Sequence, residues 1–563
     1  MLGKMIFSVA VFVVAGCHGH FNNKDFPTGK AVIPAGKPAP PVSEGVIEMS
    51  EPLPAKEGTV PRDRTINERN GYNDIFLDSL DVERFIVKEK LNDTVAMAIR
   101  AFYNVRNDEY AWFSSAGLIE QSVSFRSLYS AENDVDLFNK SLEDRLDGLR
   151  TRRGAIVRAK DPSTIETELQ ITERFIQYAK KNYEDMGIAL TALGTYIPAK
   201  RRAITDFADF VLANNSINNH YAALNESYRL LKVPLQQYSA IEKRGGWPVI
   251  SATGKGYHVG AGDPGIALLK KRLQMTGELA GDDTSRLFDT ALENAVKAYQ
   301  WNHGFDTSGV VTKALVKDMN ISVLARMEQL IINMQRMRWM PVHPDGLLII
   351  VNIPEFELYV DSNKTILFQM DVVVGAEGHN TTMFSGNVGQ VVFSPYWNIP
   401  PSIVRKEVVP GMRREREYLE KRHMEIYGRE GGLPLIRQRP GADNALGKVK
   451  FLFPNNFNIY MHDTPEKEFF NKSERDLSHG CIRLSNAPKM AYFLLRNSPL
   501  WPREKIDAAM NSGHQQFVKL APPVPVIITY YTAWVDNKGV LHFAGDIYRH
   551  DRQMAQKMYM DPQ

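Results

Sequence analysis

The sequence of 563 residues predicts a multidomain α+β protein. At roughly 150 residues per domain, this length accommodates three or four folded units. Apolar residues recur every three or four positions up to about residue 339, which predicts helices, and alternate with polar residues after Pro341, which predicts strands. We therefore expect helical domains first and a β-rich domain after them.

The composition is that of an ordinary soluble globular protein, with 44% hydrophobic and 24% charged residues. The formal net charge of +3 is too small to indicate a nucleic-acid partner. The sequence also lacks basic clusters with interleaved aromatic residues, which nucleic-acid-binding domains commonly carry. We expect no nucleic-acid partner.

Residues 1–17 have the pattern of a signal peptide. Lys4 precedes an apolar run at residues 5–14 that is too short to cross a bilayer alone. The following text, "VAGC", resembles a bacterial lipobox. That resemblance implies diacylation of Cys17, a lipid anchor and, because His18 is not Asp, sorting to the outer membrane. The alternative is ordinary secretion with Cys17 left free.

Residues 18–69 are rich in proline and lysine and have little apolar periodicity, as in "FPTGKAVIPAGKPAPPVSEG". Such a composition cannot bury enough apolar surface to fold, so a disordered tether is expected. Residues 70–245 then show helical spacing, as in "ETELQITERFIQYAKKNYEDM", and no clustering of histidines with carboxylates. We interpret this part as a helical scaffold domain without catalytic residues.

Residues 246–320 contain a weak internal repeat of two amphipathic helices, each expected to end at a glycine. The repeated positions are Leu269, Leu273, Gln274 and Gly277 in one copy, and Val296, Tyr299, Gln300 and Gly304 in the other. This text resembles the three-helix peptidoglycan-binding domain, which implies binding of cell-wall glycan or stem peptide. The alternative is a packing module without a ligand.

Residues 321–343 continue with a scaffold helix, "ISVLARMEQLIINMQRMRW", ended by Pro341. Its methionines share one face with Leu324 and Ile331, and such a stripe is typical of core packing rather than of a cofactor site.

Residues 344–563 form the predicted β-rich domain, with strands at "EFELYV", "TILFQMDVVV", "GQVVFSPYWNIPPS", "KVKFLF" and "FNIYMH". Further strands are expected at "PVPVIITYYTAWVD" and "LHFAGDIY", and a turn at "DSNK". A charged insertion at about 402–441 interrupts the domain. It is either a solvated helix or a lid over a site.

The chain has two cysteines, Cys17 and Cys481. If Cys17 is acylated, Cys481 has no partner for an intramolecular disulfide and remains a free thiol. A nucleophilic thiol needs a base and N–H donors for the oxyanion. His462 and His479 lie near Cys481 in sequence, and Gly480 allows a tight turn. A structural cysteine, or a metal site of His462, His479 and Cys481, are the alternatives.

The text "IYMHDTPEKEFFNKSERDLSHGCIRLSN" matches a known catalytic signature: a histidine, a spacer, then S/T-H-G-C, an apolar residue and arginine. Fifteen residues separate His462 from Ser478, which fits the spacer. Together with "VNIPEFELYV", "VVFSPYWNIPPSI" and "ITYYTAWVDNKGVLHFAGDIYRHD", the chain resembles the large periplasmic branch of the L,D-transpeptidase family over residues 70–550. The resemblance implies a helical scaffold, a peptidoglycan-binding domain and a catalytic domain with an inserted capping lid.

The resemblance also implies roles for individual residues. Cys481 would be the nucleophile and His462 the general base, oriented by the backbone carbonyl of Asp463. The N–H groups of Gly480 and Cys481 would form the oxyanion hole, with His479 in support. Three further candidates for shaping the pocket or contacting substrate are Tyr460, Arg483 and Trp397.

The implied reaction is cysteine acyl transfer from a tetrapeptide stem to the side-chain amine of a neighbouring stem, which releases D-Ala and forms a 3-3 cross-link. No metal or other cofactor is implied. The expected setting is the periplasm, with peptidoglycan and cell-wall synthesis proteins as partners, a role in cell shape and inhibition by carbapenems. Alternatives are an L,D-carboxypeptidase, a wall-anchoring transferase or a non-catalytic wall-binding lipoprotein.

Overall fold

The computed structural model describes residues 60–560, except for short internal segments. These segments are 132–138, 152–156, 184–188, 214, 216–217, 220, 223–224, 252–255 and 340–345. The predicted signal peptide, Cys17, most of the predicted tether and Pro341 therefore lie outside the described residues.

The tether was predicted to run to residue 69, but residues 60–69 are folded onto the helical part. Ile66 is buried, and the Asp63 amide donates a hydrogen bond of 2.9 Å to the carbonyl of Asn104. The Asn104 side chain in turn donates to the carbonyl of Val60 at 2.9 Å. One apolar anchor and several polar contacts thus order a segment whose composition alone suggests disorder.

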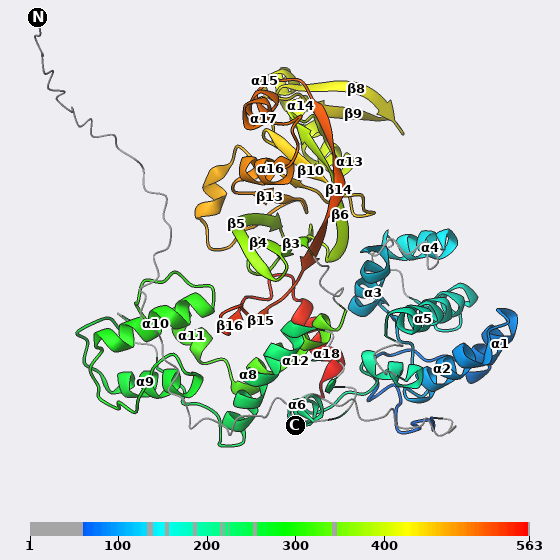
Figure 1. Cartoon of the computed structure of the whole chain (residues 1–563), viewed down its shortest axis with the longest axis vertical. Helices are drawn as coiled ribbons and strands as arrows, with labels where there is room; N and C mark the ends of the chain where they lie inside the picture. The colour runs from blue at the N-terminus through cyan, green and yellow to red at the C-terminus, as the bar shows by residue number, and fades with distance from the viewer. Residues whose placement is uncertain are drawn as a thin grey trace, which may run out of the picture. The chain divides into compact units, whose positions relative to one another are not determined.

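Helices make up the first part of the described chain (Figure 1). They are α1 (Ser79–Lys88), α2 (Asp93–Asn104), α3 (Glu120–Ala131), α4 (Lys140–Thr151), α5 (Pro162–Tyr183), the 3₁₀-helix η3 (Leu190–Tyr196), α6 (Ile204–Leu212) and α8 (Glu226–Glu242), with a small hairpin of β1 (Phe113–Ser114) and β2 (Gly117–Leu118). The side chains of Asn92 and Asn225 cap α2 and α8. Trp112, Phe125 and Phe175 pack edge to face in the core.

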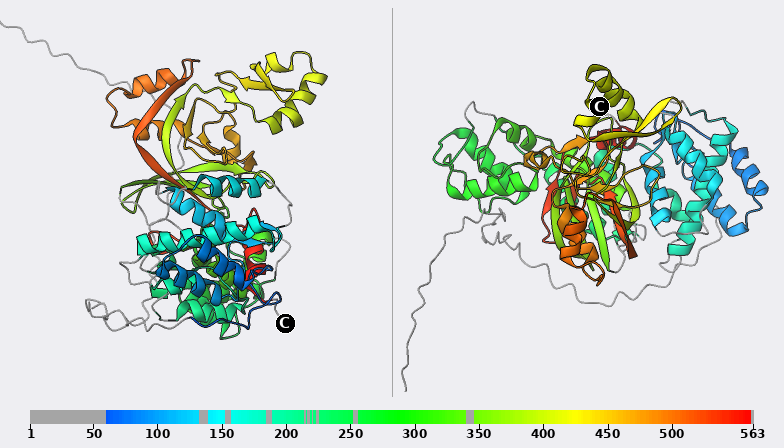
Figure 2. Two further views of the ribbon diagram at one scale, coloured as in Figure 1. Left: turned by 90° about the vertical axis from the view of Figure 1, so that its right-hand side faces the viewer. Right: turned by 90° about the horizontal axis from the view of Figure 1, so that it is seen from above.

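The scaffold helix α12 (Val323–Met337) packs against α8, and its Met327, Met334 and Met337 are buried, as the stripe predicts. A later part of the chain returns to the same core as β15 (Ala533–Val535), β16 (Leu541–Phe543) and α18 (His550–Met558). Figure 2 shows α18, in red, beside the helices. This segment belongs to the predicted catalytic domain of residues 344–563, and its apolar residues also fill the core of the helices.

The repeat region forms α9 (Pro264–Thr276), α10 (Thr290–Asn302) and α11 (Lys313–Met319) around their own core. Gly277 ends α9 in the left-handed region, at φ +94°. Helix α10 ends at His303, and the left-handed residue Gly304 follows. In the described part of the chain, every helix is too short or too polar to span a membrane.

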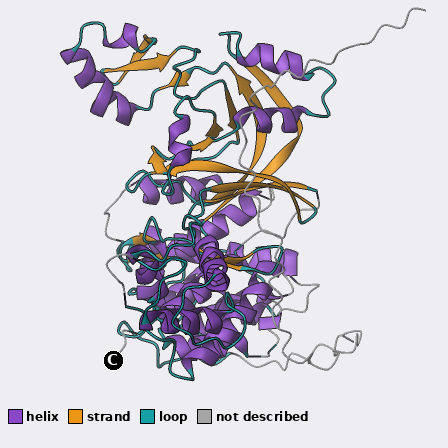
Figure 3. Ribbon diagram, turned by 90° about the vertical axis from the view of Figure 1, so that its left-hand side faces the viewer, coloured by secondary structure: helices purple, strands orange, loops and turns teal. Residues whose placement is uncertain are grey.

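The β-rich part holds one large sheet, whose strands are drawn in orange in Figure 3. In spatial order the strands are β12 (Asp476–Ser478), β5 (Thr365–Gly375), β13 (Ile482–Leu484), β11 (Met461–His462), β10 (Val449–Leu452), β6 (Phe384–Phe393), β14 (Gln516–Thr529), β3 (Leu347–Asn352) and β4 (Glu357–Ser362). A further pairing of β4 with β5 closes the sheet on itself like a barrel. Helices α16 (Ala487–Leu495) and α17 (Arg503–Met510) bury their apolar faces in the core of this sheet.

The insertion has its own small core. It consists of β7 (Trp397–Asn398), α13 (Pro401–Ile403), the π-helical turn η4 (Val404–Val408), α14 (Val409–Arg414), α15 (Tyr418–Lys421), β8 (Met424–Glu430) and β9 (Leu433–Gln438). Ile403, Val404, Val408 and Ile436 are buried together, so the insertion is a compact unit rather than one solvated helix.

Candidate active site

Three neighbouring strands, β10, β11 and β13, place a row of polar side chains on one face of the sheet. Phe451, Met461 and Ile482 are buried in the core and stand in register across these strands. Because successive side chains of a strand point to opposite faces, their neighbours Lys450, His462 and Arg483 face away from the core. His462 pairs with Lys450 on one side and with Arg483 on the other.

Cys481 stands immediately before β13, beside Tyr460. The amide of the next residue donates to the Tyr460 carbonyl at 3.1 Å. The thiol is free and half-buried, and its Sγ lies 3.6 Å from the Asn458 carbonyl. Burial raises the pKa of the Cys481 thiol, against the opposing effects of hydrogen bonds to Tyr460 and the charge of Arg483. The resting Cys481 side chain is therefore a neutral thiol rather than a thiolate.

His462 is buried, and its Nδ1 hydrogen-bonds the backbone carbonyl of Asp463. A carbonyl only accepts, so the contact requires the proton on Nδ1 and leaves the lone pair on Nε2. Burial first, and the Arg483 charge second, lower the pKa of His462 to about 3. The imidazole is thus neutral and able to accept a proton through Nε2, and the contact expected of Asp463 is formed.

The Ser478 hydroxyl stabilises the turn from Ser478 to Cys481 through two hydrogen bonds. Ser478 Oγ donates to the Cys481 carbonyl at 2.6 Å and accepts the Gly480 N–H at 3.1 Å. Gly480 has φ +112°, which only glycine adopts without strain. The predicted oxyanion hole used the Gly480 and Cys481 amides, but the Gly480 amide already has a partner here. The Cys481 N–H is the donor that remains for an oxyanion.

Two residues that the sequence analysis did not single out, Thr381 and Gly375, contact this turn. Thr381 Oγ1 donates to the Gly480 carbonyl at 2.8 Å and accepts the Gly375 N–H at 2.9 Å. A Cβ added at Gly375 would lie 2.0 Å from the His379 carbonyl and 3.0 Å from Gly480 Cα. Gly375 at the end of a strand is a weak signal for such a close approach, and Thr381 gave no local signal.

Arg483 and Tyr460, for which a pocket-shaping role is predicted, have aromatic and charged neighbours. Arg483 pairs with Glu466, and its guanidinium lies 5.4 Å from the Phe469 ring centre. The Tyr460 ring centre is 5.6 Å from that of His462 and 5.7 Å from Lys450 Nζ. Lys450 thus adds positive charge beside the thiol, a contribution that the motif does not reveal.

The two remaining candidates, His479 and Trp397, both contact the insertion. His479 is exposed, with Nε2 3.5 Å from Glu407 of the insertion and its ring 5.1 Å from that of His379. Trp397 pairs with Gln438 and packs against the insertion's own core. Among the described residues, no three His, Cys, Asp or Glu side chains are arranged to hold a metal ion, so the ligand set His462, His479 and Cys481 is not formed.

The part of the chain that carries this face was compared with models of known protein families. Residues 347–554 match the model described as "L,D-transpeptidase catalytic domain". The chain carries an L,D-transpeptidase catalytic domain. The resemblance inferred from the motif and the α+β fold class are both confirmed. Cys481 and His462 lie inside the matched L,D-transpeptidase domain.

The regions before the L,D-transpeptidase domain also match family models. Residues 97–235 match a "Scaffold domain", and residues 262–319 match a "Putative peptidoglycan binding domain".

A curated relative is a Haemophilus influenzae protein named "Putative L,D-transpeptidase", 28% identical over 253 residues. The match covers 42% of this chain and 50% of the relative, so the chain spans about half the length of the curated protein that it matches. Among solved structures, the L,D-transpeptidase from Mycobacterium smegmatis matches at 14% identity and a TM-score of 0.19, over 33% of this chain and 58% of that one. The L,D-transpeptidase from Xylanimonas cellulosilytica matches at 13% identity and a TM-score of 0.16, over 50% of this chain and 100% of that one.

Proposed function

We propose that this protein forms 3-3 cross-links in peptidoglycan by cysteine acyl transfer. One arrangement carries the proposal: a half-buried thiol, Cys481, stands directly before β13, and β13 pairs with the strand β11 of a buried, neutral His462 whose tautomer the Asp463 carbonyl selects. A neutral base paired with a neutral thiol suits a nucleophile that is deprotonated as it attacks. The match to an L,D-transpeptidase catalytic domain supplies the substrate class.

In the first half-reaction, His462 Nε2 takes the thiol proton while Cys481 Sγ attacks the carbonyl of the diamino acid at the third stem position. The Cys481 N–H donates to the oxyanion that develops. The bond to the terminal D-Ala then breaks, and the proton on His462 passes to the leaving amine. The product is a thioester on Cys481 and free D-Ala.

In the second half-reaction, the side-chain amine of a neighbouring stem attacks the thioester. His462 takes a proton from that amine, the C–S bond breaks, and the proton returns to the sulfur. If water attacks instead, the product is a trimmed tripeptide, and if a protein amine attacks, that protein is anchored to the wall.

Mass spectrometry of muropeptides incubated with the purified protein tests the proposal. We expect cross-linked dimers and free D-Ala, both abolished by Cys481→Ala and kept by Cys17→Ala, a control at the other cysteine. Binding of Cys481→Ala to wall sacculi should be unchanged, because the matched peptidoglycan-binding domain lies at residues 262–319. Cross-linking by Cys481→Ala would overturn the mechanism. A tripeptide as the sole product would indicate a carboxypeptidase. A stem peptide linked to a protein would indicate an anchoring enzyme, and the absence of any product would indicate a non-catalytic wall-binding role.

We also propose that the protein acts in the periplasm, anchored to the outer membrane by a diacylated Cys17. The support is the text of residues 1–17, with its short apolar run and "VAGC". Metabolic labelling with a palmitate analogue should mark the wild type and not Cys17→Ala. An unlabelled mature wild-type protein would contradict the anchor.

A further inference from the structure

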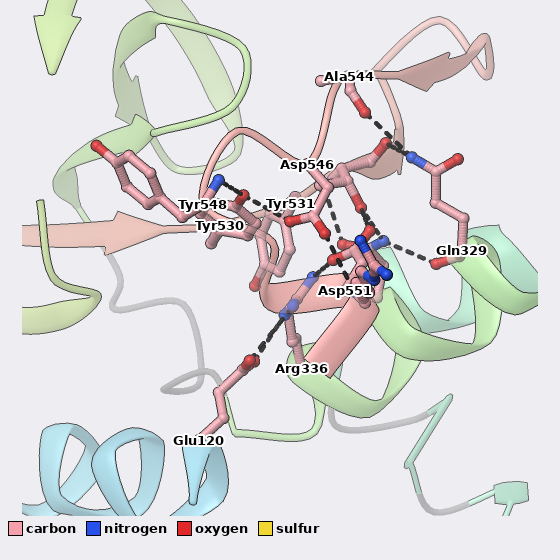
Figure 4. A network of polar contacts seen from close by, with 12 residues as sticks. Glu120, Gln329, Arg336, Tyr530, Tyr531, Ala544, Asp546, Tyr548 and Asp551 are labelled. Carbon is pink, nitrogen blue, oxygen red and sulfur yellow. Dashed lines mark hydrogen bonds and ion pairs between the residues drawn. The ribbon is translucent and has the colours of Figure 1, made fainter. Parts of the chain in front are cut away.

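A buried charged cluster joins the helical part to the segment that returns from the catalytic domain. Arg336 of α12 lies 2.6 Å from Glu120 of α3 and also pairs with Asp551 of α18 (Figure 4). A buried guanidinium that loses one of two partners leaves an uncompensated charge, so this cluster fixes three helices together. Asp551 also accepts from Thr532 Oγ1 at 2.5 Å.

The amides of α12 extend this connection. Asn333 Nδ2 donates to Thr532 Oγ1 at 2.7 Å, and Asn333 Oδ1 accepts the Thr532 N–H at 3.0 Å. Gln329 Nε2 donates to the carbonyls of Thr532 and Ala544 at 2.8 and 3.1 Å. With these groups paired, the chain that leaves β14 at Thr529 is held at a defined position on α12.

Two stacked tyrosines lead from this cluster toward the catalytic sheet. The Arg336 guanidinium lies 5.2 Å from the Tyr530 ring centre, and the Tyr530 and Tyr548 ring centres are 5.7 Å apart. The Tyr530 hydroxyl accepts the Tyr548 N–H at 2.8 Å and donates to Asp546 at 2.7 Å. Both rings are buried, so their hydroxyls have fixed partners.

The path ends on the turn that carries the thiol. The Tyr548 hydroxyl donates to the Gly375 carbonyl and accepts the Thr381 N–H at 3.3 Å. Thr381 Oγ1 then donates to the Gly480 carbonyl at 2.8 Å. That carbonyl shares its peptide plane with the Cys481 N–H, and in a trans peptide the two groups point in opposite directions. Holding the carbonyl toward Thr381 therefore aims the Cys481 N–H away from it.

We propose that Tyr548 and Thr381 are positioning residues that aim the Cys481 N–H at the oxyanion, and that Tyr530 and Arg336 couple this aim to the helical part of the molecule. We call Arg336, Tyr530, Tyr548 and Thr381 the tyrosine relay. The inference rests on the proposed acyl transfer at Cys481. A donor misplaced by about 1 Å costs on the order of a hundredfold in rate, so small shifts along the relay matter to catalysis.

The first test is Tyr548→Phe, which removes the hydroxyl and keeps the ring. We expect the kcat for D-Ala release to fall about tenfold or more, with KM within twofold. Tyr531→Phe is the matched control, because the neighbouring Tyr531 makes its hydrogen bonds through its backbone. An unchanged kcat in Tyr548→Phe would overturn the proposal.

A second readout does not depend on stem peptides. p-Nitrophenyl acetate acylates a thiol through an oxyanion, whereas iodoacetamide alkylates it without one. Peptide mass spectrometry reads Cys481 separately from Cys17. Tyr548→Phe should slow acylation about tenfold and leave alkylation within twofold. Equal losses in both reactions would indicate general damage and reject the positioning role. If p-nitrophenyl acetate acylates the wild type but the wild type releases no D-Ala from stem peptides, the proposed function fails. The positioning role of Tyr548 is then still tested by the ratio of the acylation rate to the alkylation rate.

Thr381 gives an independent test that stands if Tyr548→Phe does not fold. Thr381→Val removes the hydroxyl at similar volume and should reproduce the selective loss of acylation, and Thr381→Ser should restore it. A Thr381→Val protein with the wild-type ratio of acylation to alkylation would overturn the proposal.

The coupling between the helical part and the turn is measured by a double-mutant cycle of Arg336→Lys with Tyr548→Phe. Effects on the acylation rate should be less than additive, and fully additive effects would reject the link to the helices.

Discussion

Burial favours the neutral form of both the Cys481 thiol and the His462 imidazole. It raises the pKa of the thiol and lowers that of the imidazole to about 3, so both are neutral across physiological pH. Arg483 acts on both as well: its charge favours the thiolate and disfavours the imidazolium. Arg483 therefore lowers both pKa values, which opposes the larger effect of burial at Cys481 and adds to it at His462.

Replacing Arg483 by Met should move the pKa of Cys481 further above its ordinary range, because a nearby positive charge that favours the thiolate is lost. The pH profile of Cys481 alkylation by iodoacetamide, read by peptide mass spectrometry, should then shift to higher pH by up to about one unit. Arg496→Met is a control, since Arg496 is exposed and stacks on Phe493 away from this face. A profile that is unchanged or shifted to lower pH would contradict the electrostatic role of Arg483.

At the scale of single residues, the sequence predicted the contact of His462 with the Asp463 carbonyl, because both residues lie within one short motif. It did not predict the hydrogen bond from Gly480 N–H to Ser478, because that bond depends on a backbone angle that the sequence does not show. The roles of Cys481 as nucleophile and His462 as base stay predictions. Thr381 lies about a hundred residues before the Gly480 carbonyl that it holds, so only the folded chain reveals it.

Among the elements, the insertion departs most from its prediction. Its Arg- and Glu-rich text suggested helix or lid, yet it also forms the hairpin of β8 and β9. The signal was present: Gly431 and Gly432, both at positive φ, separate two alternating runs. The strands at "EFELYV" and "TILFQMDVVV" and the turn between them are confirmed, because a period of two is a strong local pattern.

Glu407 of η4 is the point where the insertion approaches the motif, through His479 at 3.5 Å. If the insertion acts as a lid, Glu407→Ala should loosen it and speed the labelling of Cys481 by a bulky maleimide relative to iodoacetamide. An exposed contact of this kind is worth up to about 1 kcal/mol, so the ratio should change by up to about fivefold. Glu417→Ala, in the same insertion but paired with Lys421, should leave the ratio unchanged. No change in Glu407→Ala would argue against a lid held at this contact.

Across the whole molecule, the catalytic sheet and the helical core share residues from the same late segment of chain. Met554 and Met558 of α18 are buried in the helical core, while Tyr530 and Tyr548 contact the sheet. The sequence suggested separate consecutive domains because its periodicity changes near residue 341. Periodicity reports local structure and cannot show that a distant segment returns to an earlier core.

Met558→Ala should destabilise the protein by about 2–5 kcal/mol, because it leaves a cavity in a fully buried position. The midpoint of urea unfolding measures this, and Met560→Ala is the matched control because Met560 is 51% exposed. We further expect the rate of Cys481 acylation to fall in the same urea range in which helix content is lost. Loss of helix content with acylation unaffected would show that the two parts are independent.

The return of α18 to the helices has a consequence for how the protein is made. The helical core draws on residues near the beginning of the described chain and on Met554 and Met558 near its end. Synthesis proceeds from the N-terminus, so this core cannot be completed until Met554 and Met558 have been made. Contacts between such distant positions form slowly. The helical core is therefore completed only after the catalytic sheet has been synthesised, and until then its aromatic side chains are a surface to which chaperones can bind.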